Sequence, residues 1–97
     1  MGISNTETLN ERATFSRMKI YPNPSKDYAN IEIKLNEEVM GAELIVYNLL
    51  GMVVTKRNVV NDEVFTISTR GYNNGIYFFV LSTEEGVIEK QKIIISK

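Results

Sequence analysis

Neighbouring carboxylates are the first residues of this sequence that could do chemistry. Three acidic pairs lie beside expected turns, and loop carboxylates are common Ca²⁺ ligands. The pairs are Glu37-Glu38, Asp62-Glu63 and Glu84-Glu85. None of them has the D-x-[DN]-x-[DN]-G spacing of a calcium loop, and acidic turn residues are ordinarily solvated. We therefore expect no metal site.

Nucleophilic side chains are present, but the sequence has no conventional base to activate them. There is no Cys and no His, which removes thiolate chemistry, imidazole acid/base catalysis and nearly every zinc site. Ser25, Ser68 and Ser82 remain, and an isolated serine in a strand or turn is commonplace. We expect no catalytic residues, no cofactor and no enzymatic activity.

Composition and charge exclude further classes of function. The chain has 97 residues, of which 43% are hydrophobic and 24% charged, as in an ordinary small globular domain. Eleven Lys and Arg residues against 12 Asp and Glu leave a net charge of −1, so nucleic acid is not an expected partner. No stretch approaches the roughly 18 apolar residues of a membrane span.

The chain divides near residue 16. Residues 3–14 are polar, with only Ile3 and Leu9 as large apolar residues and no period, which is typical of a flexible leader or linker. From residue 17 onward, short β-branched and aromatic runs recur between Gly, Asn and Pro residues. We expect a leader over residues 1–16, accessible to proteolysis, and one folded domain over residues 17–97.

The periodicity of the domain predicts strands throughout. Residues 28–35 alternate apolar and polar side chains, which indicates one wet face, and Lys56 and Arg57 are both expected to face water. Turn signals occupy residues 48–51 and 71–75. The expected strands are 18–21, 28–35, 42–47, 52–60, 63–69, 76–81 and 87–95. Seven short strands with hairpin spacing predict an all-β fold, a seven-stranded antiparallel immunoglobulin-like β-sandwich.

Aromatic residues leave an alternative function open. The rings that could form a carbohydrate platform are Tyr21, Tyr28, Tyr47, Tyr72, Tyr77, Phe78 and Phe79. Strand alternation favours core packing for most of them. A carbohydrate-binding or adhesive sandwich module of a surface protein therefore stays as the alternative, together with a purely structural spacer.

The last expected strand is unusual because three β-branched residues stand so close to residue 97. Residues 93–95 are all Ile, and they must be buried by the fold or by a partner. Such a strand end suits capture by a receptor through strand addition or carboxylate recognition. Lys90 and Lys92 fit an edge strand guarded against pairing, although oligomerisation through edge strands stays open.

Four segments, in order, carry a resemblance to a known family. They are residues 20–25 (IYPNPS), 46–51 (VYNLLG), 75–80 (GIYFFV) and 89–97 (EKQKIIISK). Together they resemble the type A C-terminal sorting domain of the type IX secretion system of Bacteroidetes, and the resemblance covers residues 19–97. Each segment alone is common, whereas all four in this order are specific.

The resemblance implies an address label rather than a catalyst. It implies the tail of a larger cargo protein that passes through the periplasm, meets an outer-membrane shuttle barrel and reaches the cell surface or the medium. A surface sortase usually cuts such a tail off, in the region before Tyr21. The implied recognition residues are Lys92, Ile93, Ile94, Ile95, Ser96 and Lys97. The matching motif positions, which we expect to be structural, are Pro22, Asn23, Pro24, Gly51, Gly75, Ile76 and Tyr77.

Overall fold

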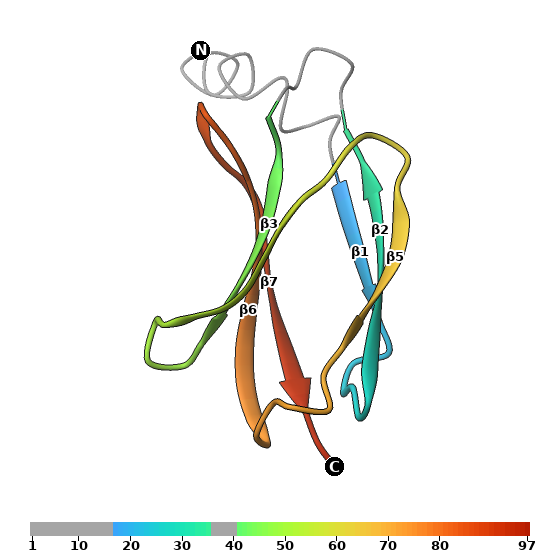
Figure 1. Ribbon diagram of the computed structural model, residues 1–97, viewed down its shortest axis with the longest axis vertical. Helices are drawn as coiled ribbons and strands as arrows, with labels where there is room; N and C mark the ends of the chain where they lie inside the picture. The colour runs from blue at the N-terminus through green and yellow to red at the C-terminus, as the bar shows by residue number, and fades with distance from the viewer. Residues whose placement is uncertain (1–16, 36–40) are drawn as a thin grey trace, which may run out of the picture.

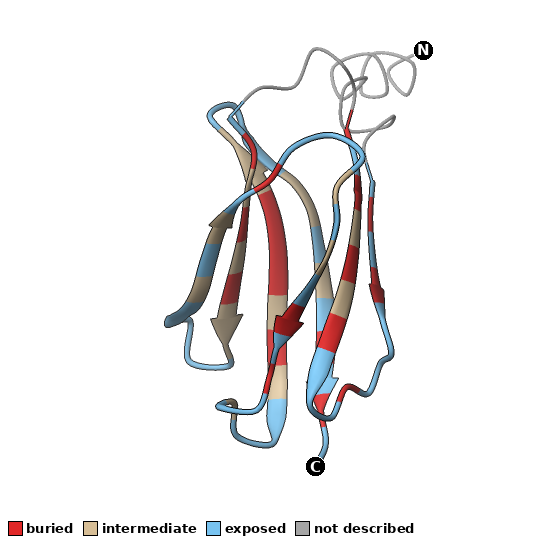
Figure 2. Cartoon of the chain, turned by 45° about the vertical axis from the view of Figure 1, so that its right-hand side comes forward, coloured by how far each residue is buried: buried red, intermediate tan, exposed pale blue. Residues whose placement is uncertain are grey.

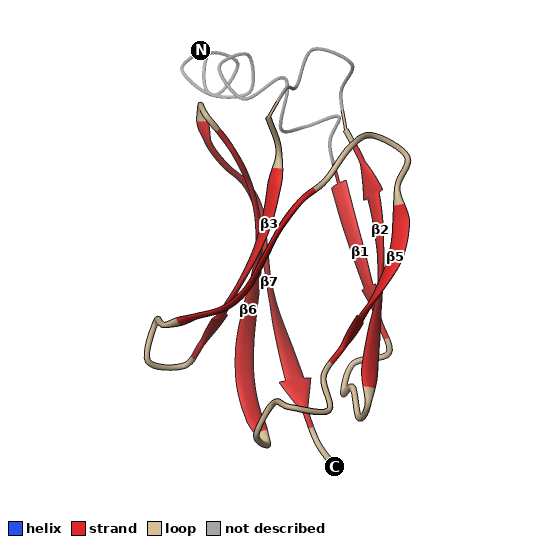
Figure 3. Ribbon diagram, viewed as in Figure 1, coloured by secondary structure: helices blue, strands red, loops and turns tan. Residues whose placement is uncertain are grey.

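The computed structural model describes residues 17–35 and 41–97, and these residues form seven strands and no helix (Figure 3). The strands are β1 (Arg17–Tyr21), β2 (Tyr28–Lys34), β3 (Glu43–Asn48), β4 (Val53–Asn58), β5 (Val64–Ser68), β6 (Gly75–Thr83) and β7 (Gly86–Ile95). Every predicted strand is confirmed to within two residues at each end. The predicted leader and the Glu37-Glu38 pair lie outside the described residues. In the described ranges, no helix is long and apolar enough to cross a membrane.

The strands form two antiparallel sheets that face each other (Figure 1). The three-stranded sheet has the order β1-β2-β5, and the four-stranded sheet has the order β4-β3-β6-β7. All strand pairs within the sheets are antiparallel. The predicted immunoglobulin-like sandwich is therefore confirmed, and β7 is an edge strand of its sheet, as its lysines suggested.

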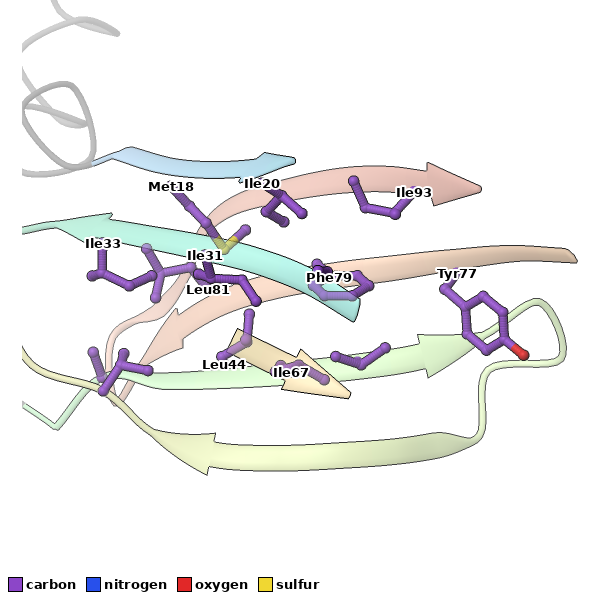
Figure 4. Close-up of a cluster of buried hydrophobic side chains, with 14 of the residues drawn as sticks. Met18, Ile20, Ile31, Ile33, Leu44, Ile67, Tyr77, Phe79, Leu81 and Ile93 are labelled. Carbon is purple, nitrogen blue, oxygen red and sulfur yellow. The ribbon is translucent and has the colours of Figure 1, made fainter. Parts of the chain in front are cut away.

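Side chains from both sheets fill the space between them (Figure 4), and buried residues alternate with more exposed ones along the strands (Figure 2). Ile31 of β2, Leu44 of β3 and Phe79 of β6 are fully buried there. Each side chain of this kind stabilises the fold by about 1.5–3 kcal/mol relative to exposure. The inward positions fix the register, because a slip of one residue would turn the apolar side chains of a strand to solvent.

The outer face of the three-stranded sheet is polar, and its side chains form hydrogen bonds with one another across neighbouring strands. Lys19 of β1 stands opposite Glu32 of β2. The Tyr21 hydroxyl donates to Glu32 Oε2 at 2.6 Å, and Thr66 Oγ1 donates to Asn30 Oδ1 at 3.0 Å. This is the wet face that the alternation of residues 28–35 predicted.

The outer face of the four-stranded sheet is apolar along its middle strands. Tyr47 of β3 stands opposite Phe78 of β6, and Ile45 stands opposite Val80. Val80 is only 6% exposed although it lies outside the core cluster. The two outer faces of the sandwich thus differ in chemistry.

The environment of Arg57 differs from the one predicted from the sequence. The prediction that both Lys56 and Arg57 face water is wrong for Arg57, because adjacent residues of a strand point to opposite faces. Arg57 Nη2 donates to Glu63 Oε2 at 2.6 Å, and the guanidinium lies 3.7 Å from the Phe65 ring centroid. Desolvation pushes the pKa of Glu63 upward, but the Arg57 hydrogen bond and the Val60 amide outweigh it, so this pKa lies below its ordinary value. Arg57 ties β4 to the start of β5.

Candidate functional site

Two of the resemblance segments pair directly with each other. In the β6–β7 ladder, Gly75 stands opposite Ile95, Ile76 opposite Ile94, and Tyr77 opposite Ile93. The register therefore places the GIY segment along the inner edge of the end of β7. Gly75 opens β6 at φ +149°, a conformation that side-chain-bearing residues rarely adopt.

The PNP segment lies along the opposite edge of the same residues. Ser25 forms a parallel bridge with Ile95, because its amide donates to the Ile94 carbonyl at 2.8 Å and its carbonyl accepts from the Ser96 amide at 2.8 Å. Asn23 Oδ1 accepts from the Ile94 amide at 3.0 Å, and Asn23 Nδ2 donates to the Lys92 carbonyl at 3.3 Å. The end of β7 is thus hydrogen-bonded along both edges.

The loop that supplies these contacts is itself held in shape. The Ser25 hydroxyl donates to the Pro22 carbonyl, and Ser25 is fully buried. The peptide bonds before Pro22 and Pro24 are both cis. Because proline fixes its own φ angle and has no amide donor, the loop presents Asn23 and Ser25 rather than the prolines to β7.

Lys97 is held by the turn that follows β5. Its backbone amide donates to Asn74 Oδ1 at 2.9 Å. Its ammonium donates to the carbonyls of Thr69 at 2.8 Å and of Arg70 at 2.7 Å. The residue is exposed, but its ammonium donates to backbone carbonyls rather than being free in solvent.

The same turn connects to the rest of the sandwich. The Thr69 amide donates to the Asp27 carbonyl at 2.9 Å, and the Thr69 hydroxyl donates to the Lys26 carbonyl at 3.0 Å.

The Tyr72 and Tyr77 rings lie 4.9 Å apart between centroids. Burial raises the pKa of Tyr72, although its hydrogen bond with Thr55 acts in the opposite direction.

We call this assembly of residues 22–25, 69–77 and 92–97 the β7 clamp. Ile93 and Ile95 are each 1% exposed and point into the core, whereas Ile94 is 40% exposed and points outward. Ser96 and Lys97 are also exposed. A partner that approaches the clamp meets the side chains of Lys92, Ile94, Ser96 and Lys97 on a backbone of fixed shape.

The structure brings together most, but not all, of the residues that the resemblance singled out. The PNP positions, the GIY positions and residues 92–97 meet in the clamp, whereas Gly51 lies in the turn between β3 and β4. At that turn the Gly51 amide donates to the Asn48 carbonyl at 2.9 Å, and Gly51 has φ +86°. Thr69 and Asn74 also belong to the clamp, although the sequence pattern indicates only a strand position for Thr69 and a turn position for Asn74.

The geometry bears on the expected strand addition and on the carbohydrate platform. Addition of a receptor strand at the end of β7 would require loop 22–25 to release its hydrogen bonds first. The exposed rings of Tyr21 and Tyr28 belong to the three-stranded sheet, and the half-buried Tyr47 and Phe78 to the four-stranded one, so these rings do not form one platform. Across residues 17–35 and 41–97, no group of three or more acidic residues is placed to hold a metal ion.

The fold is an all-β sandwich whose last strand is held along both edges by segments that resemble family motifs. Residues 19–96 match the family described as secretion system C-terminal sorting domain. The chain belongs to this family, the sorting tails of the type IX secretion system. The family consists of secretion signals rather than catalysts.

Two curated relatives carry a similar segment. The chain is 29% identical to Beta-agarase D of Zobellia galactanivorans over 99 aligned residues, which is 95% of this chain. It is 38% identical to Beta-agarase A of the same organism over 65 residues, which is 65% of this chain. The matched segments are 19% and 11% of the lengths of these relatives, so the chain corresponds to a small part of each.

Proposed function

We propose that this domain carries a larger cargo protein from the periplasm through the type IX translocon, across the outer membrane, to the cell surface or the medium. Membership of the sorting-domain family supports a secretion signal and an interaction with the secretion machinery. The outer-membrane shuttle barrel is the proposed receptor. A surface sortase then removes the tail in the region before Tyr21.

The observation that carries the proposal is the convergence of three family-like segments on the end of β7. Residues 22–25 and 75–77 hold both edges of the strand around Ile94. The machinery would then recognise the exposed side chains of a folded strand end rather than an extended chain. Such recognition needs no ordering of the tail on binding, which removes an entropic cost of about 1–2 kcal/mol per residue.

Delivery of a reporter tests the function directly. We would fuse residues 1–97 to an exported fluorescent protein in a bacterium that has a type IX system, and measure protease-accessible reporter at the surface. Surface reporter is expected with the native tail, and periplasmic reporter with residues 94–97 deleted. Normal delivery by the deleted tail would contradict recognition at the clamp.

A point variant separates recognition from folding. Ile94→Ser changes a side chain that is 40% exposed and leaves its backbone hydrogen bonds to Ser25 and Asn23 in place. We expect lower surface delivery with a nearly unchanged thermal midpoint. Val64→Ser, at an exposed position of the other sheet, is the matched control and should deliver normally.

Sortase processing needs its own measurement. We expect mass spectrometry of the medium to find a released tail whose first residue precedes Tyr21. A tail that stays covalently attached to the surface reporter would contradict processing, while leaving transport intact.

A further inference from the structure

The outer face of the four-stranded sheet contains a hollow that the β7 clamp does not use. It has a volume of about 350 Å³ and lies beside the turn that joins β3 to β4. Its lining includes Tyr47, Leu49, Phe78, Val80, Val87 and Lys90, and we call it the apolar hollow. In Figure 1 the β3–β4 turn projects away from the three-stranded sheet.

Exposed apolar residues form a rim around this hollow. Leu49 and Val87, which line the hollow, are 63% and 64% exposed, and Leu50, the next residue of the turn after Leu49, is 84% exposed. The Asn48 side chain holds the turn in place, because its Oδ1 accepts from the amides of Leu50 at 2.9 Å and Met52 at 3.0 Å. Large apolar side chains fixed in solvent beside a concave apolar floor are typical of a protein interaction site.

Positive charge lies on the β7 side of the hollow. Lys90 Nζ lies 5.1 Å from the Phe78 ring centroid, and Lys92 stands opposite Phe78 in the ladder. Neither lysine forms a salt bridge with any other described residue, whereas Lys56 Nζ, on β4 at the opposite edge of the sheet, lies 3.7 Å from Glu43 Oε2. A complementary partner therefore carries carboxylates where it meets β7.

We propose that the apolar hollow is a docking site for a protein of the secretion machinery that inserts an apolar side chain flanked by carboxylates. The proposal rests on the proposed function and adds a second contact surface to the clamp. A second copy of this chain fits poorly, because it would bring its own Lys90 and Lys92 to the same face. A lipid surface fits poorly as well, because it has no projecting side chain to fill a concave floor.

Three substitutions test the site through surface delivery of the reporter fusion. Leu49→Asp and Val87→Asp place charge on the apolar rim, and Lys90→Glu reverses the charge on the β7 side. We expect each to lower surface reporter at least about tenfold, the effect of losing an interface hot spot. Lys90→Arg keeps the charge and should deliver like the native tail.

Matched controls come from the polar outer face. Val64→Asp introduces the same charge at a position 67% exposed on β5. Lys19→Glu reverses a lysine that lies over the Tyr21 ring at 5.8 Å, much as Lys90 lies over Phe78. Both should deliver normally, and all variants should keep thermal midpoints within about 4 °C of the native domain, since the changed residues are exposed. If Leu49→Asp or Val87→Asp unfolds, delivery is measured with Leu49→Ser in its place.

The outcomes separate this inference from the proposed function. If the native tail fails to deliver its cargo, both are overturned. If the native tail and all three variants deliver equally, only the apolar hollow is overturned. Binding of the purified domain to phosphatidylglycerol vesicles that is lost in Leu49→Asp would replace the protein partner with a lipid surface. A dimer in analytical ultracentrifugation that Leu49→Asp dissociates would replace it with a second copy.

Discussion

The β7 clamp and the apolar hollow both contain residues of the family-like segments, but the two regions use them in opposite ways. In the clamp, backbone and side-chain donors and acceptors are engaged within the domain, as Asn23, Ser25 and Lys97 show. At the hollow, Leu49 and Leu50 are fixed by the Asn48 turn and are left exposed. A family motif can therefore maintain a fold in one place and present a surface in another.

Substitutions in the two regions should therefore differ in their effects on stability and on delivery. Changes to the buried or hydrogen-bonded side chains of the clamp should reduce stability and delivery together, because these side chains hold the end of β7 in place. Changes at the hollow should reduce delivery alone, because exposed side chains contribute little to the free energy of unfolding.

Deletion of residues 94–97 should have the largest effect on stability. Ile95 is 1% exposed, and loss of such a side chain alone costs about 2–5 kcal/mol, to which the lost hydrogen bonds of the clamp add. Urea unfolding measures the change. Leu50→Ala is the counterpart at the hollow and should change the free energy of unfolding by less than about 0.5 kcal/mol. Equal losses in the two variants would remove the contrast.

Asn23→Ala should have the next largest effect. The substitution removes the amide that bonds to the Ile94 amide and the Lys92 carbonyl, which we expect to cost about 1–2 kcal/mol. Asn23→Asp keeps the acceptor for the Ile94 amide but loses the donor to the Lys92 carbonyl, so it should lower the free energy of unfolding by less. Hydrogen exchange at the Ile94 amide reports the contact directly. Unchanged protection in Asn23→Ala would show that Ser25 alone holds the strand.

Two lysines on one segment extend the comparison to smaller effects. The Lys97 ammonium donates to the carbonyls of Thr69 and Arg70, so Lys97→Ala should cost about 1 kcal/mol despite its exposure. Exposure alone would suggest almost no cost for this change. Lys92→Ala, at an exposed position on the outer face of β7, should cost less than about 0.5 kcal/mol. Thermal unfolding distinguishes the two, and the reverse order would contradict the assigned contacts.

The strands could be predicted from the sequence because their signal is local. Alternation in residues 28–35 indicates which face of that strand is buried. The turn signals at 48–51 and 71–75 indicate where neighbouring strands end. Arg57 shows the limit of this approach. Charge suggested that it faces water, but its place in the strand and the position of Glu63 and Phe65 turn it toward the other sheet.

The β7 clamp could not be predicted in the same way. Asn23 and Ile94 are 71 residues apart in the sequence, and the local sequence around either residue does not indicate a contact with the other. Thr69 and Asn74 contribute a backbone carbonyl and a side-chain amide, which are features that any loop residue or asparagine offers. The resemblance indicated which segments matter, and only the fold shows that three of them meet.

The smallest expected effect is a pH dependence inside the clamp. Burial raises the pKa of Tyr72 in the folded domain, so folding favours its neutral form. This contribution is fully present below the unfolded value of about 10 and is lost as the pH rises through the folded pKa. The free energy of unfolding of the native domain should therefore fall between about pH 9 and 11 more steeply than that of Tyr72→Phe. Tyr28→Phe, at an exposed tyrosine of the polar outer face, controls for general alkaline effects and should keep the native slope. Parallel curves for native protein and Tyr72→Phe would mean that the ring beside Tyr77 is solvated, and that the turn holding Lys97 is looser than its hydrogen bonds indicate.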